Sequence, residues 1–104
     1  MLGAVRAAAP PEARVQVVVD GALMKAFGVA FADFVQIRDI AADKKDLTRY
    51  TIIFDRNATQ LMVAFVPKFP HGWSGIGGET PYGREVTYSI NANSYAIMQR
   101  QFGE

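Results

Sequence analysis

The stretch RYTIIFDRNATQLMVAFV, residues 49–66, decides the fold. Its side chains alternate between two faces, which predicts a strand from Arg49 to Asp55 and a returning strand from Gln60 to Val66. The tetrapeptide 56–59 contains the Asn that is typical of a tight turn. Both faces of the returning strand are apolar, so we expect it in the middle of a sheet. Pro67 ends this strand.

Two further strands follow in the same manner. Arg84–Ile90 alternates with Val86, Tyr88 and Ile90 facing inward, and Tyr95–Phe102 follows after the short turn 91–94, with Tyr95 and Ile97 on one face. Short turns join antiparallel neighbours. The second half of the chain therefore predicts a curved, four-stranded antiparallel sheet.

One long helix is expected before the sheet, from Pro11 to Asp43. Apolar residues recur there at spacings of three and four, which is typical of one helical face. Pro10 and Pro11 suit the first turn of such a helix. A competing interpretation is that Val15–Val19 is a short strand, since valine-rich runs favour sheets. In that case the helix would be broken near Gly21 and the sheet would have five strands.

The fold class predicted is α+β, with the long N-terminal helix packed on the four-stranded sheet. We expect a flexible segment over residues 1–11 and a single domain over residues 12–104, a normal domain size. The expected core is drawn from both layers: Leu23, Phe27, Phe31, Phe34, Ile52, Phe54, Leu61, Val63, Phe65, Val86, Tyr88, Ile90 and Ile97.

The composition excludes several classes of protein. Eleven Lys and Arg against ten Asp and Glu give a net charge of +1 with scattered basic residues, so we expect no nucleic-acid partner. The absence of cysteine excludes disulfides, zinc–thiolate sites and thiol nucleophiles, but leaves the redox compartment open. No apolar run approaches the ~20 residues of a membrane-spanning helix. Met1–Pro11 has no basic region and too short an apolar run for an intact signal peptide.

A family resemblance emerges from the strand motifs. After the helix come Tyr50–Phe54, then Leu61–Lys68 with its Phe-x-Pro ending, a loop with Gly77-Gly78, and the strand Val86–Ile90. This pattern resembles small bacterial cystatin-like domains, relatives of the nuclear-transport-factor-like group. The resemblance implies a protease inhibitor, an immunity protein or a secreted binding domain, and slightly favours a periplasmic or secreted location over the cytoplasm. The run QVVVDG, residues 16–21, is only superficially similar to the protease-binding loop of true cystatins, because it lies where the helix is expected.

Catalytic and metal-binding chemistry has little support. His71 is the only histidine, and only Ser74 and Glu79 lie near it in sequence. Zinc needs three or four ligands at defined spacings. The glycines of residues 75–78 lack the Gly-Lys-Ser/Thr ending of a phosphate-binding loop. Asp33 and Asp55 are the only acids embedded in apolar stretches. We therefore expect no catalytic residue, no metal and no cofactor.

The loop from Pro67 to Gly83 is the predicted binding site. It spans seventeen residues with three prolines and five glycines, and loops of this length are usually functional or disordered. Its aromatic content argues against disorder. We expect it to contact a protein partner with Trp73 as the anchor, through Phe69, His71, Trp73, Ile76 and Tyr82. The alternative is that Trp73 folds back to cap the open end of the sheet.

Self-association is also expected. A second apolar stripe on the predicted helix, formed by Val17, Met24 and Val35, and the fully apolar strand 61–66 together leave hydrophobic surface that a homodimer would cover. The sequence thus predicts a small, non-catalytic protein-binding module of an inhibitor or immunity type that forms a homodimer. The alternative is a small enzyme or ligand-binding protein of the related cone-shaped fold, whose pocket would hold Asp33 or Asp55 together with His71.

Overall fold

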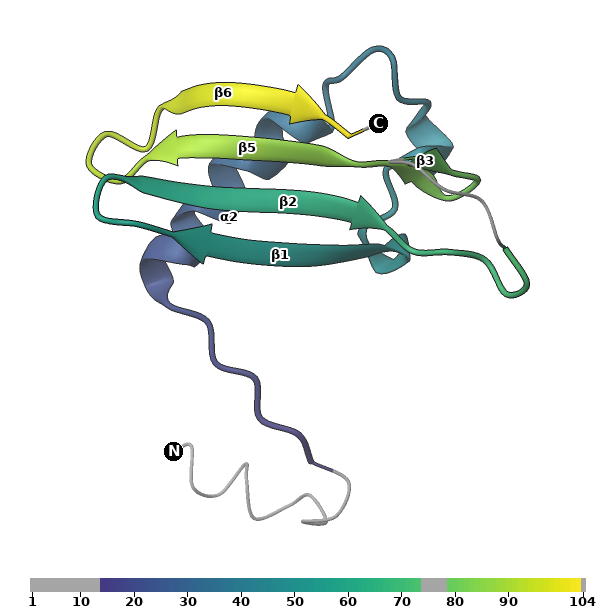
Figure 1. Ribbon diagram of the computed structural model, residues 1–104, viewed down its shortest axis with the longest axis horizontal. Helices are drawn as coiled ribbons and strands as arrows, with labels where there is room; N and C mark the ends of the chain where they lie inside the picture. The colour runs from purple at the N-terminus through teal and green to yellow at the C-terminus, as the bar shows by residue number, and fades with distance from the viewer. Residues whose placement is uncertain (1–13, 74–78, 104) are drawn as a thin grey trace.

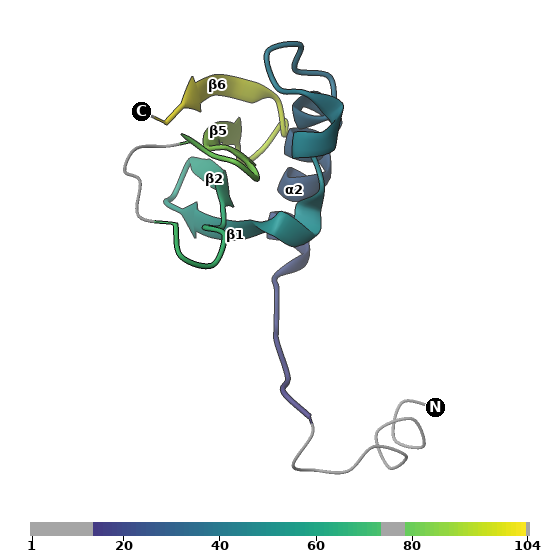
Figure 2. The same cartoon turned by 90° about the vertical axis from the view of Figure 1, so that its right-hand side faces the viewer.

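A computed structural model describes residues 14–73 and 79–103. Its elements are α2 (Gly21–Phe34), the short 3-10 helices η2 (Ala42–Lys44) and η3 (Leu47–Arg49), β1 (Tyr50–Arg56), β2 (Gln60–Pro67), β3 (Glu79–Thr80), β4 (Gly83–Arg84), β5 (Val86–Asn91) and β6 (Ile97–Phe102). Strands β1, β2, β5 and β6 form one open antiparallel sheet in that order (Figure 1). Helix α2 covers one face of it (Figure 2). The predicted α+β architecture is confirmed.

Two asparagines make the tight turns of the sheet. The side-chain oxygen of Asn57 accepts hydrogen bonds from the backbone N–H groups of Thr59 and Gln60, both at 2.9 Å. Asn91 accepts in the same way from Asn93 and Ser94, at 2.8 and 2.9 Å. An Asn side chain at this position replaces a backbone turn hydrogen bond. The β1–β2 turn lies where the sequence predicts it. The β5–β6 connection is longer than predicted, because β6 begins at Ile97 and Tyr95, which was expected in the strand, has φ of 61°.

The start of the helix differs from the prediction. Helix α2 begins at Gly21, and its N-cap is Asp20, whose carboxylate accepts from the N–H of Ala22 at 3.4 Å. Val15–Val19 belong to neither a helix nor a strand and are exposed. Valine loses side-chain freedom in a helix, so the four valines before Asp20 resist helical structure. The expected start at Pro11 lies outside the described residues.

The end of the helix is also earlier than the predicted Asp43. The helix stops at Phe34, and the chain then turns so that Ile37 and Ile40 become buried. The ammonium group of Lys45 donates hydrogen bonds to the carbonyls of Val35 and Ile37, both at 2.8 Å. Carbonyls at the end of a helix have no partner within the helix, and a lysine side chain satisfies them here.

The core is centred on Phe34. Its ring stacks on Phe65 with centroids 4.4 Å apart and planes 4° apart, and it meets the edge of Tyr50 at 5.3 Å. Ala26 and Ala30 are fully buried two turns and one turn before Phe34, so small residues let the helix lie close to the sheet. The buried core comprises Ala26, Ala30, Phe34, Ile37, Ile40, Tyr50, Leu61, Val63, Phe65, Val86, Tyr88 and Ile90.

Several residues expected in the core lie at its margin. Leu23, Phe27, Phe31, Ile52 and Phe54 are only partly buried. The expectation for Ile97 was wrong, because this side chain is 37% exposed. Its strand is an edge strand, and the pairing of β6 with β5 shifts register next to Ile90. Such a bulge turns the edge strand away from the core.

A polar contact joins helix α2 to strands β5 and β6. The hydroxyl of Tyr88 donates to Oδ2 of Asp33 at 2.7 Å, and the guanidinium of Arg100 donates to the same oxygen at 2.8 Å. Partial burial raises the pKa of the Asp33 carboxyl, but the hydrogen bonds from Arg100 and Tyr88 outweigh it and leave this pKa below its ordinary value of 3.8. Burial and the neighbouring Asp33 carboxylate raise the pKa of Tyr88.

The lowered pKa predicts a loss of stability in acid. A carboxyl whose pKa is lower in the folded than in the unfolded chain stabilises the fold above its unfolded pKa, and this contribution disappears as the pH falls through the folded pKa. We expect the free energy of unfolding to fall below about pH 4 and Asp33→Asn to flatten that fall. The measurement is urea denaturation at a series of pH values.

Asp39→Asn provides a control for the substitution at Asp33, because it removes the carboxylate of an exposed residue on the surface. Both variants lose one acidic charge, so a change caused by net charge alone would be the same in both. Equal acid profiles for Asp33→Asn and the unmodified protein would contradict the role of this contact.

Candidate functional site

The base of the loop between β2 and β5 is fixed by backbone hydrogen bonds. The N–H of Lys68 donates to the carbonyl of Arg49 at 2.8 Å, which continues the β1–β2 ladder by one residue. The hydroxyl of Thr80 then donates to the carbonyl of Lys68 at 2.9 Å, and Thr80 is buried. The two limbs of the loop are therefore joined to each other where they leave the sheet.

The second limb carries a small hairpin that packs on Tyr50. Strands β3 and β4 pair through Thr80 and Gly83. The hydroxyl of Tyr50 donates to the carbonyl of Lys44 at 2.6 Å and accepts from the N–H of Arg84 at 3.2 Å. A Cβ atom on Gly83 would collide with the Tyr50 ring and hydroxyl. Only glycine allows this close approach, which holds the hairpin against the end of the sheet.

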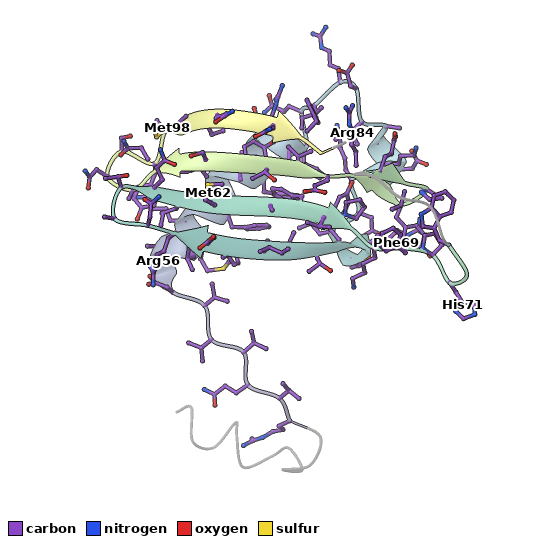
Figure 3. All side chains as sticks on the ribbon, viewed as in Figure 1. Arg56, Met62, Phe69, His71, Arg84 and Met98 are labelled. Carbon is purple, nitrogen blue, oxygen red and sulfur yellow. The ribbon has the colours of Figure 1, made fainter. Side chains whose placement is uncertain are left out.

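A tight turn presents the aromatic residues of the first limb. The N–H of Trp73 donates to the carbonyl of Pro70 at 2.9 Å, and Gly72 has φ of +81°. This combination is typical of a type II turn, which needs a residue of positive φ in its third position. The turn runs from Pro70 to Trp73 with His71 at its apex, and Phe69 comes directly before it. In Figure 3 the labelled His71 lies at the outer tip of the loop, beyond the end of β2.

The predicted loop residues have different surroundings. Phe69 is 56% exposed and Trp73 is 42% exposed, which favours the outward orientation of Trp73 over a ring folded back as a cap. His71 is exposed. Tyr82 is partly buried at the base, where the guanidinium of Arg49 lies 4.6 Å from its ring centroid. Ile76 lies outside the described residues. We call residues 69–73 the aromatic turn.

The acids and the histidine considered for catalysis do not converge. Asp33 is held by Tyr88 and Arg100 on the face that the helix covers. Asp55 alternates with Phe54 along β1 and so points to the opposite face, where it is exposed. His71 lies in the aromatic turn. Within residues 14–73 and 79–103, no three His, Asp or Glu side chains come together as a metal site would require.

A surface depression lies where β5 begins and β6 ends. It has a volume of about 300 Å³ and is lined by Glu85, Thr87, Gln101, Phe102 and Gly103. Its lining offers one carboxylate and no histidine or cationic side chain. No helix in the described part of the chain is long and apolar enough to cross a membrane.

Comparison with protein families, characterised proteins and solved structures finds no match to this chain. The site therefore has to be interpreted from its own geometry. Sequence reasoning located the loop but missed the turn inside it, for which Gly72 at the third position is the local signal. It also missed the contacts of Tyr50 with the hairpin, because they join positions more than thirty residues apart.

Proposed function

We propose that this protein is a small, non-catalytic protein-binding module whose contact surface is the aromatic turn. The observation that carries the proposal is the pair of large exposed rings, Phe69 and Trp73, on a loop whose base is fixed at both limbs. A tryptophan on a rigid turn loses little conformational freedom on binding, which favours affinity. Tryptophan is also among the residues most enriched at the energetic centres of interfaces.

The chemistry of the turn indicates the kind of surface it fits. The two rings need an apolar pocket or groove, and the exposed Lys68 and His71 beside them suit a rim with acidic groups. A protein partner of this kind agrees with an inhibitor or immunity-type role, as the cystatin-like resemblance implies. An enzymatic role has less support, since Asp33 is engaged by Arg100 and the stacked rings of Phe34 and Phe65 fill the space between helix and sheet.

Substitution of Trp73 by alanine tests the proposal. Loss of a tryptophan at an interface centre costs about 2 kcal/mol or more, so the dissociation constant for a captured partner should rise at least about 30-fold. The free energy of unfolding should change by less than about 1 kcal/mol, because an exposed ring contributes little to folding. Isothermal titration with the purified partner and urea denaturation provide the two measurements.

Met98→Ala is a matched control, since Met98 is 54% exposed on β6, at the other end of the sheet from the labelled His71 (Figure 3). It should leave the affinity unchanged. If Trp73→Ala binds the same partner as tightly as the unmodified protein, the contact lies elsewhere. If Trp73→Ala unfolds, the ring belongs to the folding core and the proposal is wrong.

A further inference from the structure

The segment Val15–Val19, called here the valine segment, is extended and exposed. Val15, Val17 and Val18 are 87%, 79% and 80% exposed. Within the described part of the chain, residues 15–19 make no backbone hydrogen bond. Figures 1 and 2 both show the segment leaving the start of α2 and running away from the sheet. Its composition is that of a strand, but its backbone groups and valines lack the partner that a strand needs.

The outer edge of strand β1 has backbone N–H and carbonyl groups to which an added strand could bond. The N–H of Asn57 donates to Gln60, and the carbonyl of Arg49 accepts from Lys68. Hydrogen-bonded positions alternate along an antiparallel pair, so the odd-numbered residues of β1 bond to β2. The N–H and carbonyl groups of Ile52 and Phe54 and the carbonyl of Tyr50 then point away from β2, toward the open edge of the sheet, while the N–H of Tyr50 donates to the carbonyl of Leu47.

The two edges of the sheet differ in how they are protected. Charges, prolines or bulges usually prevent an edge strand from pairing with another chain. Strand β6 has such features, with Arg100 at its centre and a register shift near Ile97. The stretch 50–54 of β1 has no charge, no proline and a continuous register with β2. Beside this edge Ile52 and Phe54 remain partly buried, and Phe27 lies against Phe54 with ring centroids 6.4 Å apart.

The position of Asp20 argues against pairing within one chain. Its carboxylate caps the helix and forms an ion pair with Arg56, the last residue of β1. A valine segment folded onto its own β1 would therefore end beside Arg56 and run parallel to the strand. Parallel pairs are slightly less stable than antiparallel ones. The segment instead points outward from the β1 side of the molecule (Figure 1).

We propose that the valine segment of one copy adds as an antiparallel strand to the β1 edge of a second copy. Every copy has one such segment and one such edge, so a two-fold axis satisfies both at once. The valines that point inward would cover Phe27, Ile52 and Phe54, and extend the hydrophobic core. This interface differs from the helical stripe expected from the sequence, because Val17 lies outside α2.

Proline substitutions in the full chain test the exchange. Proline lacks the N–H that a ladder hydrogen bond needs. Neighbouring residues of a strand point their N–H groups to opposite sides, so one of Val17→Pro and Val18→Pro must remove a bond to the partner. At least one of them should raise the dimer dissociation constant about 100-fold or more in sedimentation equilibrium. Both should keep the circular dichroism of the fold, because these residues are exposed.

Two controls and a second readout separate the outcomes. Val17→Thr keeps strand propensity, and Met24→Lys alters the exposed helix face, so both should remain dimeric.

Hydrogen exchange should show the amides of Ile52 and Phe54 protected in the unmodified protein and unprotected in the proline variant. A monomer with protected edge amides would mean that the segment pairs with its own sheet, and the proposal would fail. A monomer with an unprotected edge, or a dimer unaffected by either proline, would overturn it too.

Discussion

Phe34→Ala is expected to lower the free energy of unfolding by about 4 kcal/mol, since truncation of a buried phenylalanine leaves a cavity as well as losing its transfer energy. Phe34 is fully buried, and its ring lies between the stacked Phe65 and the edge of Tyr50. The rigid sheet on one side and the helix on the other limit how far the site can collapse. The measurement is urea denaturation followed by circular dichroism.

Phe31→Ala is the matched control for this prediction. Phe31 is three residues earlier on the same helix and stacks on Phe27 at 5.6 Å, but it is only partly buried. Because part of its ring is already in water, we expect a loss of about 2 kcal/mol. A larger loss for Phe31→Ala than for Phe34→Ala would contradict the position of the helix on the sheet.

Gly83→Ala is expected to cost about 3 kcal/mol of unfolding free energy, because the added methyl group overpacks the site and displaces the hydroxyl of Tyr50. That hydroxyl bonds both to Lys44 and to Arg84. A displaced Tyr50 would leave these two backbone groups without their partner and release the β3–β4 hairpin. Thermal and urea denaturation measure the loss of stability.

Gly28→Ala is the corresponding control, since apart from its chain neighbours and the backbone of its own helix no atom lies within 4 Å of the position its methyl group would take. In the middle of α2 this change should stabilise the protein by about 0.5–1 kcal/mol. The double variant Tyr50→Phe with Gly83→Ala should be less destabilised than the two single effects added together, because the first change removes the hydroxyl, the nearest of the atoms that the added methyl group would meet. Additive effects would argue against this contact.

The aromatic turn and the valine segment are separate surfaces, so their tests are independent. The turn lies beyond the end of β2, and the segment leaves from the start of α2, at the opposite end of β1 (Figure 1). A partner held by Trp73 does not require the dimer, and Val17→Pro should not change affinity for that partner. The two proposals can therefore fail or succeed separately.

The sequence by itself determined the sheet. Alternation in residues 50–67 and 86–91 sets which side chains face the helix, and Asn57 and Asn91 set the turns through bonds to residues two or three positions away. Both causes act between residues that are close together in the sequence, so they can be predicted from the sequence without the tertiary structure. The sequence likewise placed the long irregular connection between β2 and β5, because prolines and glycines act on their own backbone.

Only the tertiary structure decided the length of the helix and the contacts of the loop. Apolar periodicity continues past Phe34, but burial of Ile37 and Ile40 and the bonds from Lys45 end the helix there. Tyr50 contacts Gly83, and Asp33 pairs with Arg100, although the two residues of each pair are far apart in the sequence, so no local sequence pattern predicts these contacts. The valine segment shows the same limit, since its residues favour a strand and a strand exists only where a neighbour supplies hydrogen bonds. Local sequence fixes which conformations are available to a segment, and packing against distant residues selects among them.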